Sequence, residues 1–168
     1  MMTTAQAALA QVGSDEEQRN RDLIAQSFDA WRTGTGGPYD LLAADVSWTI
    51  TGNSLAAKTY PTKDAFIGEV IQPFNARMKS PLVPTVRKLY AQDDTVVAFF
   101  DATGIATDDR RYSNTYAWIL EMDDGQIVRA HAFFDSIAFD DLWQRIPVEP
   151  NGAAVAREAP ANQSPPND

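Results

Sequence analysis

From Pro84 onward, apolar and polar side chains alternate with a period of two, and short aspartate-rich segments interrupt the pattern. The alternation predicts four strands, near residues 84–92, 95–105, 111–122 and 126–135. The segments between them are Asp93-Asp94, Asp108-Asp109 and Asp123-Asp124-Gly125. Asp and Gly suit hairpin turns because they tolerate positive φ angles. Successive strands joined by such turns predict antiparallel pairing.

The first half of the chain has helical spacing. Ser14-Asp-Glu-Glu17 matches a capping box, which predicts that the first helix begins there. A short helix around 39–43, a strand at 45–51 and a helix capped by Thr62 are predicted next. Pro73 should end or kink this last helix because it lacks an amide donor. A closing helix carries Phe139, Leu142, Trp143 and Ile146. This order predicts an α+β fold with helices against one face of a curved sheet.

Composition limits the classes of protein to consider. A length of 168 residues suits one domain. The net charge of −9 leaves no basic stripe for nucleic acid. Cysteine is absent, which excludes disulfides and thiolate chemistry and is compatible with a cytoplasmic protein. No apolar run approaches the ~20 residues of a membrane-spanning helix, so no membrane role is expected.

Both ends of the chain have the composition of tails. Residues 1–13 are small and polar, and residues 148–168 are rich in Pro, Ala and Asn without aromatic anchors. We therefore expect a disordered N-terminal tail, a folded domain at 14–147 and a disordered C-terminal tail.

Polar groups occur on the predicted strands among aromatic residues. Asn114, Tyr116 and Trp118 must point the same way because side chains alternate along a strand. Phe99 and Asp101 on the preceding strand are expected to share that face. A carboxylate, a carboxamide and a phenol facing an apolar hollow are typical of a small-molecule site.

The order of elements resembles the nuclear transport factor 2-like superfamily, in particular its SnoaL-like and ketosteroid-isomerase-related branch. The matching segments are Ala44–Gly52, Thr62–Phe66, Tyr112–Tyr116 and Asp124–Ile127 leading to Phe133-Phe134-Asp135. The resemblance covers residues 20–147. It implies a cone-shaped, curved, mostly antiparallel sheet with helices packed on the concave face, enclosing a pocket. It also implies homodimers through the outer face of the sheet.

Catalytic residues of these relatives carry over incompletely. The base Asp of ketosteroid isomerases aligns with Thr49 or Ile50, and their helical Tyr with Ser27 or Phe28. Their second oxyanion donor aligns with Asn114. Limonene epoxide hydrolases resemble the chain at Asp101, where their accompanying Arg is missing. Their second Asp aligns with Ala132, a position at which many SnoaL-like members also hold an acid.

Asp101, Tyr116, Asn114 and His131 are the candidate catalytic residues. Asp101 among aromatic rings would have a raised pKa and could transfer protons; the alternative is a carboxylate satisfied by Arg or backbone donors. Tyr116 and Asn114 could stabilise an oxyanion, or bond to one another and to backbone. Trp48, Ile50, Phe28, Phe99 and Trp118 are the candidate substrate-binding residues, although core packing would also explain the aromatic ones.

His131 is the chain's sole histidine, and if Ala132 faces the pocket, His131 faces outward unless a bulge turns it. One histidine without cysteine predicts no metal site. The absence of a glycine-rich phosphate loop predicts no nucleotide cofactor.

Three functions remain open. The first is a cofactor-independent isomerase, cyclase, dehydratase or lyase acting by acid/base proton transfer on a hydrophobic cyclic or aromatic molecule. The second is a non-catalytic binder of such a molecule. The third is an interaction module using the outer sheet face, although a homodimer would explain that face equally well. The residues expected on this face are Val96, Ala98, Phe100, Ala117, Ile119 and Phe133.

Overall fold

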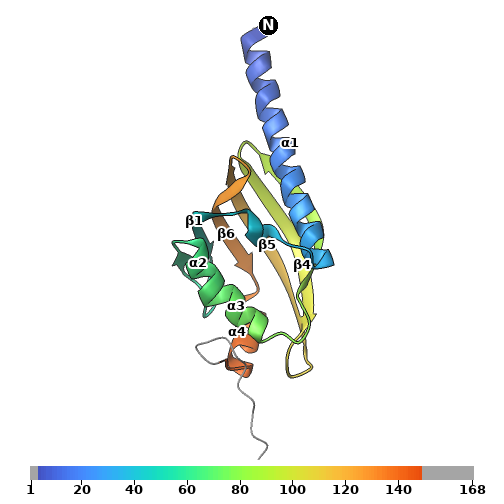
Figure 1. Ribbon diagram of the computed structural model, residues 1–168, viewed down its shortest axis with the longest axis vertical. Helices are drawn as coiled ribbons and strands as arrows, with labels where there is room; N and C mark the ends of the chain where they lie inside the picture. Colours follow the sequence, from blue (N-terminus) through green and yellow to red (C-terminus); the bar gives the residue numbers. More distant parts are fainter. Residues whose placement is uncertain (1–3, 149–168) are drawn as a thin grey trace, which may run out of the picture.

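The computed structural model describes residues 4–148, with side chains from Asp15 onward. It consists of helices and one six-stranded, curled sheet that does not close (Figure 1). The strands are ordered β2-β1-β6-β5-β4-β3, and all neighbours are antiparallel except β1 and β6. The predicted α+β class and mostly antiparallel curved sheet are confirmed. The predicted tail at 148–168 lies outside the described residues apart from Val148.

The four predicted C-terminal strands are present almost at the expected bounds. They are β3 (Val83–Gln92), β4 (Thr95–Ile105), β5 (Arg111–Asp123) and β6 (Gln126–Phe134). Each turn holds an aspartate with positive φ, at Asp93, Asp109 and Asp124. Asp124 is followed by Gly125 at φ 78°, which suits a tight hairpin. The Asp-containing turns identified in the sequence therefore locate the ends of these strands correctly.

Two further strands extend the sheet beyond β6. Strand β1 (Leu42–Ile50) runs parallel to β6, so that Ile50 lies beside Ala132. Strand β2 (Thr59–Tyr60) pairs with β1 and was not predicted, because two residues show no alternation. A 3₁₀ helix, η1 (Pro38–Leu41), precedes β1 close to the predicted short helix.

Helix α1 (Thr4–Thr33) begins ten residues before the predicted start at Ser14. The capping-box interpretation of Ser14 and Glu17 is therefore wrong, since both lie inside a continuous helix. The Glu17 carboxylate instead accepts the backbone N–H of Asp93 at 2.9 Å, which ties α1 to the β3–β4 turn. The helix packs along β3 and β4 and extends past the end of the sheet (Figure 1).

A second helical segment lies over the other half of the sheet. It comprises α2 (Lys63–Phe66), a π-helical turn η2 (Ile67–Ile71) and α3 (Gln72–Ala76). Thr62 caps it as predicted, accepting the N–H of Ala65 at 3.1 Å. Pro73 does not end the segment; the wider π-helical turn ends at Ile71, two residues before it. Helix α4 (Ser136–Arg145) follows β6. The Asp135 carboxylate caps it by accepting the backbone N–H of Ile137 at 2.9 Å.

The concave face of the sheet carries alternate residues of each strand. On β5 these are the even-numbered residues, including Asn114, Tyr116 and Trp118, as predicted. On β4 they are Val96, Ala98, Phe100 and Ala102, the opposite parity to the prediction. Apolar residues occupy both faces of β4 at 96–100, so its alternation does not identify the buried face.

The outer face consequently differs from the set expected for a homodimer. Val96, Ala98 and Phe100 are buried in the core, so their assignment to the outer face is wrong. Ala117, Ile119 and Phe133 do lie on the outer face, where Ala117 is paired with Phe99 and Phe133 on the neighbouring strands. Homodimer formation stays a prediction. No helix in the described part of the chain is long and apolar enough to cross a membrane.

Candidate functional site

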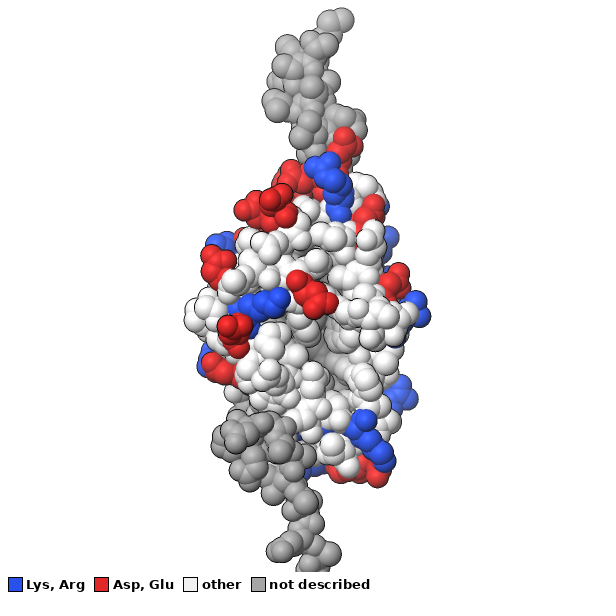
Figure 2. Space-filling view, in the orientation of Figure 1, with Lys and Arg blue, Asp and Glu red and all other residues white. Residues whose placement is uncertain are grey.

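A cavity of about 360 Å³ opens between the concave face of the sheet and the helical segment 63–76. Figure 2 shows the hollow in an uncharged area of this face, with acidic and basic side chains next to it. The walls come from the sheet, from the helical segment and from the loop after α3, together with Trp31 of α1, Tyr39 of η1 and Phe139 of α4. The lining residues are Trp31, Tyr39, Trp48, Ile50, Phe66, Val70, Ile71, Phe74, Asn75, Met78, Pro81, Leu82, Tyr116, Trp118, Ala132, Phe134 and Phe139.

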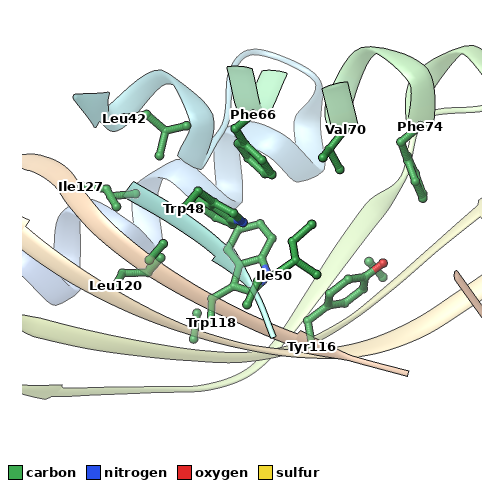
Figure 3. Close-up of a cluster of buried hydrophobic side chains, with 14 of the residues drawn as sticks. Leu42, Trp48, Ile50, Phe66, Val70, Phe74, Tyr116, Trp118, Leu120 and Ile127 are labelled. Carbon is green, nitrogen blue, oxygen red and sulfur yellow. The ribbon is translucent and has the colours of Figure 1, made fainter. Parts of the chain in front are cut away.

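Aromatic rings in mutual contact form the inner wall of the cavity. Trp48 stacks on Phe66 with ring centroids 4.4 Å apart and meets Trp118 edge-on at 5.1 Å. In Figure 3 the helical residues Phe66, Val70 and Phe74 point toward the sheet residues Trp48, Ile50, Trp118 and Tyr116. Because each ring packs against several others, the wall is held rigidly.

Trp48 also brings a polar atom into this wall. Its indole nitrogen is buried and has no hydrogen-bond partner among the described residues. The Trp48 and Trp118 rings meet edge-on, and in Figure 3 the indole nitrogen of Trp48 lies next to the Trp118 ring. The aromatic wall therefore includes a buried N–H donor.

A chain of three polar side chains ends at the cavity. The hydroxyls of Tyr112 and Tyr116 are 2.9 Å apart, and the Asn114 amide donates to Tyr112 at 3.0 Å. Strand β5 brings the three together because its even-numbered residues share one face. The ring of Phe100 stacks on that of Tyr116, with the ring centroids 4.9 Å apart and 9° between the planes.

The side-chain amide of Asn114 makes all its hydrogen bonds to other groups of the protein. Its Oδ1 accepts the backbone N–H groups of Thr115 at 2.8 Å and Asp135 at 3.0 Å. Its Nδ2 donates to the Asp135 carbonyl and to the Tyr112 hydroxyl, each at 3.0 Å. Asn114 is not among the residues that line the cavity. The structure thus places it behind Tyr112, where it joins β5 to the start of α4.

The tyrosines around the cavity remain neutral at physiological pH. Burial raises the pKa of Tyr116 well above its usual value, and the nearby Tyr112 hydroxyl adds to this effect. The pKa of Tyr39 is also raised, mainly by burial and to a smaller extent by the nearby Tyr112. Neutral phenols act as hydrogen-bond donors rather than as bases.

Asp101 lies on the outer face and not in the cavity, so the expected orientation is wrong. Its carboxylate accepts from the Thr115 hydroxyl at 2.7 Å and from Arg87 Nε at 2.6 Å, with 30% of the side chain exposed. The bonds from Thr115 and Arg87 lower the pKa of Asp101, contrary to the predicted rise. The alternative interpretation, a carboxylate satisfied by an arginine, describes this residue.

The other predicted residues divide between the two faces. Trp48, Ile50, Tyr116 and Trp118 line the cavity. Phe28 lies behind Trp118, with ring centroids 5.8 Å apart, and supports the wall from α1. Phe99 is on the outer face, where the guanidinium of Arg87 lies 5.1 Å above its ring. His131 also faces outward, between the buried Ala130 and Ala132, so no bulge turns it inward.

Several lining residues were not predicted as part of the site. Tyr112 does not line the cavity but bonds to Tyr116, and because it has the same parity on β5 as Asn114, the strand pattern could have identified it. Phe66, Val70, Ile71 and Phe74 form the apolar stripe of the helix capped by Thr62, which the sequence analysis did not assign to the pocket. The described residues contain no group of three His, Cys, Asp or Glu side chains that could hold a metal ion.

Comparison with known proteins agrees with this architecture. The family model of the SnoaL-like domain matches residues 24–130. Among solved structures, Bal32a from a soil-derived mobile gene cassette superposes with a TM-score of 0.62 at 17% identity, covering 76% of this chain and 98% of its own. No curated protein shows significant sequence similarity to the chain.

Two further structures share the fold. A protein of Jannaschia sp. CCS1, provisionally assigned as a SnoaL-like polyketide cyclase, gives a TM-score of 0.60 at 15% identity and covers 78% of this chain and 95% of its own. TerC, co-crystallised with polyporic acid, gives a TM-score of 0.59 at 20% identity. It covers 73% of this chain and 96% of its own. Since the family model spans more than half of the chain, the protein belongs to the SnoaL-like family of the NTF2-like superfamily.

Proposed function

We propose that this protein binds an apolar, ring-containing small molecule in the cavity between the sheet and the helical segment 63–76. The observation that carries the proposal is the cavity itself, about 360 Å³ with a wall of mutually packed aromatic rings. Its size and few polar groups match those of ordinary small-molecule pockets. The co-crystal of TerC with polyporic acid supports occupancy of this fold by ring compounds.

A thermal-shift screen tests the proposal with 2-acetylnaphthalene and related bicyclic and tricyclic ketones. A compound that binds only the folded state must raise the melting temperature. Two variants with the same substitution separate the cavity from the outer face: Ala132→Phe fills the cavity, and Ala117→Phe adds the same ring outside. We expect shifts for the wild type and Ala117→Phe and none for Ala132→Phe.

A second cavity-filling variant keeps this test decisive. Ile71→Trp fills the cavity from the helical side and serves if Ala132→Phe fails to fold, which circular dichroism would reveal. Equal shifts in all folded variants would contradict binding in this cavity. An absence of any shift in the wild type across the panel would contradict the proposal itself.

The second candidate function is an enzyme of isomerase, cyclase or lyase type acting next to a carbonyl group. The Tyr112–Tyr116 pair favours it, because a neutral phenol in an apolar cavity stabilises the developing oxyanion of an enolate. Against it, no residue lining the cavity in the described part of the chain is a carboxylate, a histidine or a lysine. The base would then have to be water or a group of the substrate.

Deuterium exchange distinguishes the two functions. Proton abstraction beside the carbonyl of 2-acetylnaphthalene replaces its methyl hydrogens by deuterium in D₂O, which proton NMR follows directly. Exchange faster than in buffer, and slowed in Tyr116→Phe, would support the enzyme. Binding without accelerated exchange would leave the small-molecule binder.

A further inference from the structure

The bonds around Asn114 determine the direction of the hydrogen-bond chain that ends at the cavity. Its Oδ1 faces two backbone N–H groups, of Thr115 and Asp135, which can only donate. The oxygen and nitrogen of this amide are therefore assigned by their partners. It follows that Nδ2 faces the Tyr112 hydroxyl at 3.0 Å and donates to it.

The hydrogen bond between Tyr112 and Tyr116 also has a defined donor. Its oxygen accepts from Asn114, and its single proton has one hydrogen-bonding partner among the described residues, the Tyr116 hydroxyl at 2.9 Å. Tyr112 is buried and neutral, since burial raises its pKa. A buried hydroxyl without an acceptor would cost free energy, so Tyr112 donates to Tyr116.

Tyr116 then has a proton that cannot point back at Tyr112. No other acceptor for this hydroxyl is found among the described residues, and Tyr116 lines the cavity. Its ring cannot swing away because Phe100 stacks on one side and Phe134 packs 5.7 Å from it. The O–H group therefore presents a donor to whatever occupies the cavity.

We propose that Asn114 and Tyr112 orient Tyr116 as an obligatory hydrogen-bond donor, so that the cavity selects apolar ring compounds that carry a carbonyl oxygen or an equivalent acceptor. This inference rests on the proposed small-molecule binding. Tyr116 is the residue that contacts the occupant; Tyr112 and Asn114 act through it as positioning residues. The expectation that Asn114 itself binds the oxyanion is replaced by this indirect role.

Two probes of nearly the same shape test the selection. 2-Acetylnaphthalene carries a carbonyl oxygen where 2-isopropenylnaphthalene carries a methylene group. We expect the wild type to bind the ketone about five- to tenfold more tightly, the range expected for one net hydrogen bond of about 1 kcal/mol. Tyr116→Phe should bind both probes equally. Tyr90→Phe, on an exposed tyrosine of β3, is the matched control and should keep the preference.

The positioning role requires a readout that a purely structural role would not change. The ¹³C resonance of the labelled carbonyl moves downfield when its oxygen accepts a hydrogen bond, so we expect a downfield shift on binding to the wild type. Tyr116→Phe should abolish this shift, and Tyr112→Phe should reduce it while the hydrocarbon still binds with unchanged affinity.

The outcomes separate the two proposals. Equal affinities of the wild type for ketone and hydrocarbon would overturn the donor assignment while small-molecule binding stands. A preference lost in Tyr39→Phe but kept in Tyr116→Phe would also overturn it, because Tyr39 lines the same cavity. Failure of both probes to bind the wild type would reject the proposed function and the donor assignment with it.

Discussion

Arg87 and Asp101 form an ion pair on the outer face of the sheet, with 2.6 Å between Arg87 Nε and the carboxylate. Strand β3 has a register irregularity between Val86 and Lys88, so Arg87 occupies a bulge from which its side chain reaches across to β4. Thr115 on the next strand donates to the other carboxylate oxygen. The carboxylate therefore links three strands on the face opposite the cavity.

Asp101→Asn should leave binding in the cavity unchanged, because the side chain is on the opposite face from the lining residues. We expect its affinity for 2-acetylnaphthalene to stay within about twofold of the wild type, measured by quenching of tryptophan fluorescence. Tyr116→Phe provides the contrast, with the loss described above. A large loss of affinity in Asp101→Asn, with the fold intact, would contradict the assigned orientation.

The stability contributed by Asp101 should depend on pH in the acid range. Bonds from Thr115 and Arg87 hold its pKa below the usual value of about 3.9. A carboxyl with a lowered pKa in the folded state stabilises the fold above that value, and the contribution is lost as pH falls through the folded pKa. Urea unfolding should therefore separate wild type and Asp101→Asn at pH 7, and the difference should shrink progressively as pH falls below about 3.9. A constant difference would contradict this.

Alkaline pH should destabilise the protein through its buried tyrosines. Burial, and secondarily Glu69, raises the pKa of Tyr60 to about 12, and burial also raises those of Tyr39, Tyr112 and Tyr116. Phenols that ionise near pH 10 in the unfolded chain favour unfolding from that pH upward. Absorbance at about 295 nm should therefore show these tyrosines ionising late and together with unfolding. Early ionisation of all of them in the folded protein would contradict their burial.

Gly104→Ala should destabilise the packing of β4 against the loop after α3, which supplies Met78 and Pro81 to the cavity wall. A Cβ atom at Gly104 would lie 2.6 Å from the Met78 methyl group, 3.1 Å from the Pro81 carbonyl oxygen and 3.3 Å from that of Ser80. Met78 can move, but the two backbone oxygens belong to the chain that crosses β4 after α3. Overpacking of this kind costs ~1–3 kcal/mol. Gly68→Ala, where a Cβ meets nothing within 4 Å, is the control for urea unfolding. Equal stabilities would show that the crossing segment adjusts freely.

The sequence predicted strands well where turns bounded them and less well where periodicity alone had to decide. Aspartates with positive φ punctuate β3 to β6, so their ends were placed closely. The face of β4 was misassigned because valine and phenylalanine occupy both faces at 96–100. That single error of parity moved Phe99 and Asp101 into the pocket and Phe100 out of the core.

The site was predicted where parity was unambiguous. Strand β5 alternates buried and exposed residues along most of its length, so Tyr116 and Trp118 were placed correctly. The helical wall could not be assigned, because an apolar stripe looks the same whether it packs against a core or covers a cavity. The role of Asn114 depends on its bonds to Asp135, which is distant in sequence, and periodicity carries no information about such contacts.

Arg77 is a buried cation that two helix ends stabilise. Its side chain donates to the carbonyls of Pro73 at 2.8 Å and Trp143 at 3.3 Å, in the last turns of α3 and α4, and no carboxylate pairs with it among the described residues. The guanidinium carbon lies 3.9 Å from the centroid of the Trp143 ring. Burial lowers its pKa, but the negative ends of two helices and the ring face compensate the charge.

Arg77→Met should therefore lower the free energy of unfolding by ~2–4 kcal/mol, since it removes two charge-assisted bonds of ~1.5–3 kcal/mol each and relieves part of the desolvation cost. Arg77→Lys should recover little, because an ammonium cannot reach both carbonyls while lying on the ring. Arg110→Met, which removes an exposed ion pair with Asp141, is the control and should cost under ~1 kcal/mol. Urea unfolding measures all three. Similar losses in Arg77→Met and Arg110→Met would mean that the helix ends do not stabilise the buried charge.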